Sequence, residues 1–141
     1  MLLALFCGKF MFFRTGVTSY VKNENGQFEK PENYEKNIEI IDNKIKENKV
    51  MIFSWSWCPF CKKARALFDD AGVEFESIKI DLQDDNVNLQ NALVYKTGYR
   101  KVPSVFIDGK HIGGHDSLKA ALLSGELKEM LDKAKVENDL E

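Results

Sequence analysis

Residues 50–61, which read VMIFSWSWCPFC, join an apolar run directly to a Cys-x-x-Cys pair. The run 50–53 is continuous, as expected of a strand that is buried on both faces. A helical pattern follows at once, and Pro59 suits the first turn of that helix. Cys58 is therefore predicted at a helix N-terminus, where unpaired backbone N–H groups and the helix dipole favour a negatively charged sulfur. The stretch indicates a reversible dithiol–disulfide pair at a strand-to-helix junction.

The bulk composition fits one small globular domain. The chain has 141 residues, is 44% hydrophobic and carries a formal net charge of −2. This length buries a sizeable core without disulfide staples. The near-neutral charge, with no basic cluster, gives no case for nucleic-acid binding. Three cysteines are too few for a secreted disulfide framework and suit a reducing compartment, so we expect a cytoplasmic or mitochondrial protein.

Residues 1–31 are predicted to be an N-terminal extension or targeting segment followed by a linker. Residues 1–13 are mostly apolar but too short to span a membrane, and we expect no membrane association. Basic residues and the lack of any acidic residue before Glu24 favour a mitochondrial transit peptide, whereas the low Arg and Ser content favours a disordered extension. Cys7 lies in this segment and is expected to take no part in the chemistry.

The rest of the chain alternates helical and extended patterns. The predicted elements are a helix over 34–45, a strand over 50–53, a helix over 59–71, a strand carrying Ile78, Ile80 and Leu82, a helix over 89–97, a hairpin over 105–112 that turns at Asp108-Gly109, and two short helices over 117–123 and 126–134. The strand–helix–strand unit predicts parallel strands with a right-handed crossover, and the hairpin adds antiparallel strands.

The two thiols are expected to play different roles. Cys58 opens the helix, and the charges of Lys62 and Lys63 should add to the effect of the dipole, so Cys58 is the predicted nucleophile. Cys61 falls on the inner side of the same helix, together with Phe68. Burial raises the pKa of a thiol, so Cys61 is predicted to act second, as the resolving cysteine.

Three separated segments carry a family resemblance. They are Cys58-Pro59-Phe60-Cys61 after Phe53-Ser54, TGYRKVP at 97–103, and VFIDGKHIGGHD at 105–116. In order and spacing they resemble the corresponding segments of dithiol glutaredoxins of the thioredoxin superfamily, over roughly residues 34–135. The resemblance implies an α/β, thioredoxin-like fold with a central four-stranded mixed sheet flanked by helices. The glutaredoxin domain is then expected over 32–136, followed by a polar tail over 137–141.

The same resemblance implies a function. The protein is expected to be a glutathione-dependent thiol–disulfide oxidoreductase that reduces protein–glutathione mixed disulfides and protein disulfides through Cys58 and Cys61. Glutathione is the implied co-substrate, with glutathionylated and disulfide-containing proteins as partners and glutathione reductase acting indirectly. A monomer is expected, with no bound metal.

A set of glutathione-binding residues follows from the resemblance. They are Phe60, Gln90, Lys101, Val102, Pro103, Gly114, His115 and Asp116. A cis peptide before Pro103 is implied, which turns the Val102 backbone toward an extended peptide-like ligand. Gly114 allows close backbone approach, and a helix starting at His115 and Asp116 can hold the γ-glutamyl carboxylate, although Asp116 equally suits an N-cap. Gln90 matches a glutamine that contacts the glycyl carboxylate.

One position departs from the family pattern. Glutaredoxins usually carry a lysine three residues before the nucleophile, pairing with the glycyl carboxylate, and this chain has Trp55 there. We expect Lys101 to supply the missing positive charge, with Arg100 as the less favoured donor.

Other functions fit parts of the pattern. Some glutaredoxins bind a [2Fe–2S] cluster between two subunits with glutathione as co-ligand, although Pro59 argues against this. A thioredoxin-like reductase independent of glutathione is favoured by Trp55 and Trp57. A zinc site from Cys58, Cys61, His111 and His115 has a formally suggestive His-x-x-x-His, but the two pairs lie far apart in sequence. A non-catalytic interaction module is disfavoured because both thiols are present.

Overall fold

The computed structural model describes residues 24–27 and 29–141. The predicted targeting segment and Cys7 therefore lie outside the described residues. The elements, in chain order, are α1 (Tyr34–Glu47), β1 (Val50–Ser54), α2 (Pro59–Asp70), β2 (Glu76–Lys79), the 3₁₀ turn η1 (Ile80–Leu82), α3 (Asn86–Thr97), β3 (Ser104–Ile107), β4 (Lys110–Gly113), α4 (His115–Ser124) and α5 (Glu126–Lys133). The predicted succession of helices and strands is confirmed.

The strands of the described residues form one four-stranded mixed sheet in the order β2-β1-β3-β4. β1 pairs in parallel with β2, with Phe53 opposite Ile78, and antiparallel with β3, with Ile52 opposite Val105. β3 and β4 form the predicted antiparallel hairpin. β1 lies between β2 and β3 and ends at Ser54. The Cys-x-x-Cys segment that follows therefore lies at the C-terminal end of a central strand.

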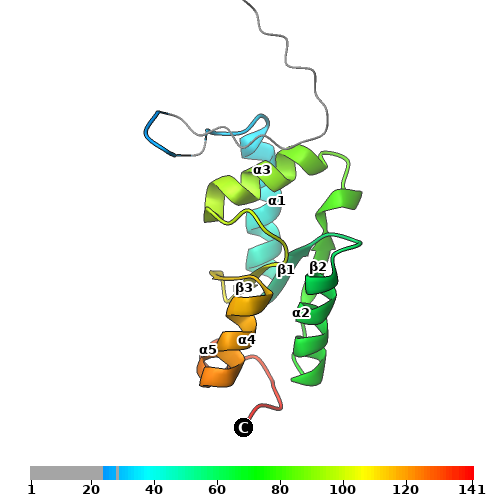
Figure 1. Cartoon of the computed structure of the whole chain (residues 1–141), viewed down its shortest axis with the longest axis vertical. Helices are drawn as coiled ribbons and strands as arrows, with labels where there is room; N and C mark the ends of the chain where they lie inside the picture. The colour runs from blue at the N-terminus through cyan, green and yellow to red at the C-terminus, as the bar shows by residue number, and fades with distance from the viewer. Residues whose placement is uncertain (1–23, 28) are drawn as a thin grey trace, which may run out of the picture.

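Helices cover both faces of the sheet (Figure 1). Alternate residues of β1 face opposite cores: Ile52 packs with α2, α4 and α5, whereas Phe53 packs with α1 and α3. Every residue of β1 is buried, which confirms that its continuous apolar run marks a strand covered on both sides. The two cores hold α2 and α3 rigidly on opposite sides of the strand that leads to Cys58.

The structure corrects the predicted strand that carries Ile78, Ile80 and Leu82. β2 ends at Lys79, and residues 80–82 form a 3₁₀ turn. The reason is pairing, since β1 stops at Ser54 opposite Lys79 and offers no further backbone partners. In the turn, Ile80 is buried in the core while Leu82 is 65% exposed.

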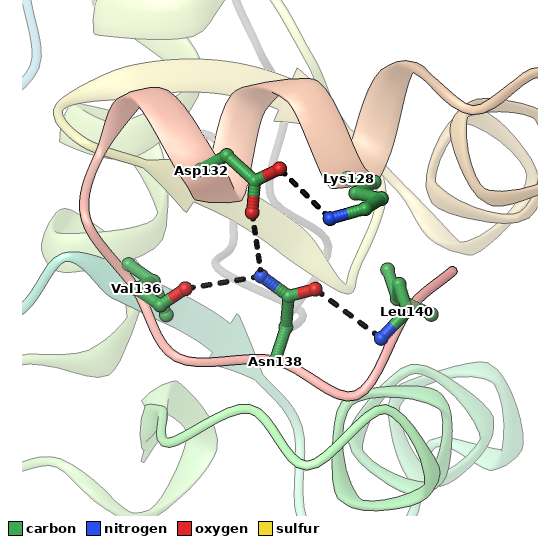
Figure 2. Close-up of polar contacts among 5 residues, drawn as sticks. All are labelled: Lys128, Asp132, Val136, Asn138 and Leu140. Carbon is green, nitrogen blue, oxygen red and sulfur yellow. Dashed lines mark hydrogen bonds and ion pairs between the residues drawn. The ribbon is translucent and has the colours of Figure 1, made fainter.

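The C-terminal residues fold back onto the domain (Figure 2). The Asn138 side-chain amide donates hydrogen bonds to Asp132 at the end of α5 and to the Val136 carbonyl, each at 3.1 Å, and its oxygen accepts from the Leu140 N–H. Leu140 packs against the core that contains Phe68. The segment predicted as a polar tail thus contributes an apolar contact to the domain.

In the described part of the chain, we find no helix with both the length and the apolar character needed to cross a membrane.

Candidate active site

Cys58 occupies the N-cap position of α2, as the sequence predicts. Its sulfur accepts a hydrogen bond from the Cys61 backbone N–H at 3.3 Å, one of the N–H groups that the first helical turn leaves unpaired. Pro59 is the first helical residue and has no N–H to compete for the sulfur. Cys58 is partly exposed. The arrangement stabilises a negatively charged sulfur at a position that a substrate can reach.

Cys61 is fully buried under the same turn, and its thiol is free like that of Cys58. Burial, reinforced by the hydrogen bond with Cys58, raises the pKa of the Cys61 thiol to about 12, against the opposing influence of a hydrogen bond with the Trp55 backbone and, less strongly, of the charge of Arg65. The two thiols thus lie three residues apart in contrasting surroundings. One is accessible and meets a backbone donor, and the other is held in its protonated form.

This contrast predicts selective alkylation. Because the pKa of Cys61 is raised, its reactive thiolate becomes scarcer at every pH below about 12, and its alkylation should speed up about tenfold for each pH unit until then. At pH 8, iodoacetamide should label Cys58 fully while Cys61 stays unmodified, as read from fragment ions of the peptide that carries both. In urea both should be labelled. Equal labelling rates in the folded protein would contradict the assignment.

A cis peptide joins Val102 to Pro103, as the resemblance implied. Pro103 is buried, and the Cys58 thiol lies 3.8 Å from the Val102 carbonyl oxygen, to which it can donate. The loop before β3 therefore meets the N-terminus of α2, although the two segments lie 44 residues apart. The Val102 backbone and the reactive sulfur lie side by side, where a peptide-like thiol can contact both.

Phe60 connects the N-termini of α2 and α4. Its ring is 51% exposed, and its centroid lies 5.7 Å from that of His115. The ammonium of Lys63 lies 5.1 Å from the same ring centroid, at a distance typical of a cation–π contact. Phe60 thus forms an exposed apolar surface close in sequence to Cys58, and the positively charged ammonium of Lys63 lies near its ring.

For the N-terminus of α4, the sequence suggested Asp116 either as the N-cap or as part of a binding site for a carboxylate. The structure excludes the first of these. Gly114, and not Asp116, is the N-cap residue, and as a glycine it has no side chain with which to cap the helix. The Asp116 carboxylate is 98% exposed and accepts a hydrogen bond from His115 at 3.3 Å. Because the N-cap residue does not occupy the first N–H groups of α4, they can meet an anionic ligand.

The two residues expected to bind the glycyl carboxylate, Gln90 and Lys101, differ in exposure. Gln90 is only 2% exposed, and its side-chain oxygen accepts a hydrogen bond from the Trp55 indole N–H at 3.2 Å. Lys101 is exposed directly before Val102. His111 bonds to the Ser104 hydroxyl at 2.9 Å on the sheet. Within residues 24–27 and 29–141, no three His, Cys, Asp or Glu side chains gather as metal ligands would, so the His-x-x-x-His does not join the cysteines.

Comparison with known proteins gives one consistent answer. A family model described as Glutaredoxin matches residues 50–112. A glutaredoxin of Ricinus communis is 40% identical over 90 residues, which cover 64% of this chain and 88% of the relative. Glutaredoxin-C6 of Oryza sativa subsp. japonica is 45% identical over 85 residues, or 60% of this chain and 76% of the relative. The chain belongs to the glutaredoxin family.

The structural comparison agrees with this assignment. The crystal structure of a buckwheat glutaredoxin–glutathione complex superposes on this glutaredoxin with a TM-score of 0.70 and 34% identity, over 72% of this chain and 93% of that one. The predicted thioredoxin-like fold and the predicted family are therefore confirmed. Glutaredoxins are glutathione-dependent thiol–disulfide oxidoreductases, and this one has the Cys-x-x-Cys active site on α2. The glutathione-independent, thioredoxin-like alternative is accordingly set aside.

Two contacts of this glutaredoxin site escaped the sequence reasoning. Tyr99 packs against Gly114 so closely that a Cβ added there would lie 2.1 Å from the Tyr99 hydroxyl. Trp55 was recognised as a departure from the family, but its bond to Gln90 was not predicted. Both contacts join side chains that are distant in sequence, and no local periodicity or spacing encodes them.

Proposed function

We propose that this glutaredoxin reduces protein–glutathione mixed disulfides with Cys58 as the nucleophile, and protein disulfides with Cys58 and Cys61 together. The supporting observation is the Cys58 sulfur, which is accessible, meets the Cys61 N–H, and lies beside the Val102 backbone next to a cis proline. Glutathione reductase acts indirectly, by keeping glutathione reduced. A reducing compartment, the cytoplasm or the mitochondrion, would supply that glutathione.

The mixed-disulfide reaction needs only Cys58. Its thiolate attacks the glutathione sulfur, the protein sulfur leaves as a thiolate and takes up a proton, and a Cys58–glutathione disulfide forms. A second glutathione, as its thiolate, then attacks the glutathione sulfur of that disulfide. Oxidised glutathione leaves, and the Cys58 thiolate is regenerated. The backbone donor at the helix N-terminus stabilises that leaving group.

Protein disulfides call for both cysteines. Cys58 attacks one substrate sulfur, and the second substrate sulfur leaves as a thiol. The thiolate of Cys61 then attacks the Cys58 sulfur, which forms the Cys58–Cys61 disulfide and frees the substrate as a second thiol. Two glutathione molecules reduce that disulfide in two exchange steps and leave as oxidised glutathione, which restores both thiols. Because the Cys61 thiol is buried and its pKa is raised, it attacks only after Cys58 has been consumed in the mixed disulfide.

Glutathione would lie extended across the site. Its cysteinyl backbone would pair with Val102, and its γ-glutamyl carboxylate would meet the free N–H groups of α4 beside His115 and Asp116. Phe60 and Pro103 would flank its sulfur, and Gln90 and Lys101 would receive the glycyl carboxylate. The solved buckwheat relative in complex with glutathione supports this class of ligand.

The function is tested by coupled turnover. A glutathione mixed disulfide is supplied to the full-length protein together with glutathione and glutathione reductase, and oxidation of the reductase's nicotinamide cofactor is followed. We expect turnover that depends on glutathione. No turnover of the mixed disulfide, in a preparation that still reduces a protein disulfide when dithiothreitol is the electron source, would contradict the proposal.

Replacing Lys101 should weaken glutathione binding moderately. Lys101 is exposed beside Val102, so its charge contributes through solvent. Lys101→Ala is expected to raise the KM for glutathione about threefold with little change in kcat, as an exposed ion pair would. Lys110→Ala, which removes an exposed lysine from β4, is the matched control and should leave KM unchanged. An unaltered KM in Lys101→Ala would exclude Lys101 and leave Arg100 as the donor to examine.

A further inference from the structure

The hydrogen bond between Trp55 and Gln90 determines how the glutamine amide is oriented. The indole N–H can only donate, and it meets the Gln90 oxygen at 3.2 Å. The amide nitrogen is therefore turned away from Trp55. Gln90 is 2% exposed and lies on α3, whereas Trp55 follows β1, so the bond joins the two elements that flank this side of the active site.

The amide nitrogen of Gln90 is buried and, in the part of the chain that the structure describes, donates no hydrogen bond to the protein. Buried donors are almost always paired, so an unpaired one calls for a ligand or a water molecule. Gln90 lines a cavity of about 200 Å³, whose other lining residues are Trp55, Trp57, Ile80, Asp81, Asn86 and Val87.

Two other polar side chains of this cavity, Asp81 and Asn86, already take part in hydrogen bonds. The Asp81 carboxylate accepts hydrogen bonds from the backbone N–H and the hydroxyl of Ser56. The Asn86 amide donates to the Asp81 carbonyl at 3.4 Å. Trp55 supplies no charge where the family usually has a lysine. A carboxylate that enters this cavity would be repelled by the negative charge of Asp81. Its binding therefore depends on a hydrogen-bond donor, such as the Gln90 amide nitrogen, that is directed into the cavity.

We propose that Trp55 is a positioning residue for glutathione. By holding the Gln90 oxygen, it presents the amide nitrogen to the glycyl carboxylate and so replaces the direct contact of the missing lysine. The reverse amide orientation would present an oxygen to that carboxylate and repel it. This inference rests on the proposed function, because it assigns a specificity role within the same glutathione site.

The test is a double-mutant cycle in the coupled assay. Trp55→Phe keeps an aromatic ring but removes the indole N–H together with the five-membered ring that carries it, and Gln90→Ala removes the amide. A lost hydrogen bond to a charged acceptor predicts that Gln90→Ala raises the KM for glutathione about tenfold. Trp55→Phe should raise it about fivefold through the lost orientation. In both variants kcat should stay near the wild-type value, since the Trp55 backbone that contacts the cysteines is kept and only side-chain atoms are removed.

The cycle separates positioning from a merely structural role. If Trp55 acts through Gln90, Trp55→Phe should change KM little once Gln90 is alanine, so the two effects should not add. Tyr95→Phe, which removes the polar group of an aromatic residue on α3 outside the cavity, is the control and should leave both constants unchanged.

Three outcomes would overturn the inference. These are an unchanged KM in Trp55→Phe, an equal rise in KM in both backgrounds, and a fall in kcat alone. Wild-type protein that fails to use glutathione would instead refute the proposed function, and this inference with it.

Discussion

Replacing Cys58 by serine is expected to lower both reactions by about a thousandfold, because a hydroxyl group is not ionised at neutral pH and is a poor leaving group. The site makes this residue irreplaceable. Among the residues that the structure describes, Cys58 alone combines partial exposure, the N–H of Cys61 at 3.3 Å and contact with Val102. The measurement is turnover of a glutathione mixed disulfide and, separately, of a protein disulfide, by wild type and Cys58→Ser.

Cys61→Ser is the matched variant, since it makes the same atomic change three residues away. It should keep turnover of the mixed disulfide within about threefold and lose turnover of the protein disulfide, because only the second route needs a resolving thiolate. Loss of both reactions in Cys61→Ser, in a protein of unchanged thermal stability, would show that the buried thiol is needed in the first route. Residual activity in Cys58→Ser would mean that another thiol is the nucleophile.

Gly114→Ala should lower kcat/KM for glutathione by about a hundredfold, the second largest effect expected, because misplacing a binding group by about an ångström is costly. The cause is space and not backbone conformation, since the φ of Gly114, −105°, is open to any residue. A Cβ here would lie 2.1 Å from the Tyr99 hydroxyl and 3.3 Å from the Pro103 carbonyl. Either the Tyr99 ring or the start of α4 must then move, and both lie at the edge of the binding surface.

The same crowding should cost about 1–3 kcal/mol of unfolding free energy, measured by urea denaturation. Tyr99→Phe in the same chain removes the oxygen at 2.1 Å but leaves the ring carbon at 3.1 Å, so the double variant should recover part of both losses. Tyr99→Phe alone should remain close to wild type. If the double variant is no better than Gly114→Ala, the Tyr99 contact is not the cause.

Much of the fold followed from local patterns. The uninterrupted apolar run of β1 predicted burial on both faces, and all five of its residues are buried. The alternation of apolar residues up to Leu82 predicted too long a strand β2. Strand length depends on pairing with β1, which stops opposite Lys79. Asp116 looked equally suited to be an N-cap, but the turn after β4 makes Gly114 the capping residue. Both differences arise where a neighbouring strand or loop overrides a local preference.

The candidate site divides in the same way. The position of Cys58 at a helix N-terminus and the burial of Cys61 were predictable, because both follow from spacing along a single helix. The partner of Gln90 and the closeness of Tyr99 to Gly114 were not, because each joins side chains from different elements.

By itself, the sequence determined the chemistry of this protein. It specified a strand that leads into a helix, with an exposed thiol at the start of that helix and a buried one a turn later, and these depend on neighbours within a few residues of one another. Only the tertiary structure decided the shape of the binding surface. Pairing of β1 with β3 brings Val102 to Cys58 across 44 residues, and packing of α3 on β1 brings Gln90 to Trp55 across 35. Such contacts depend on the packing of the whole domain.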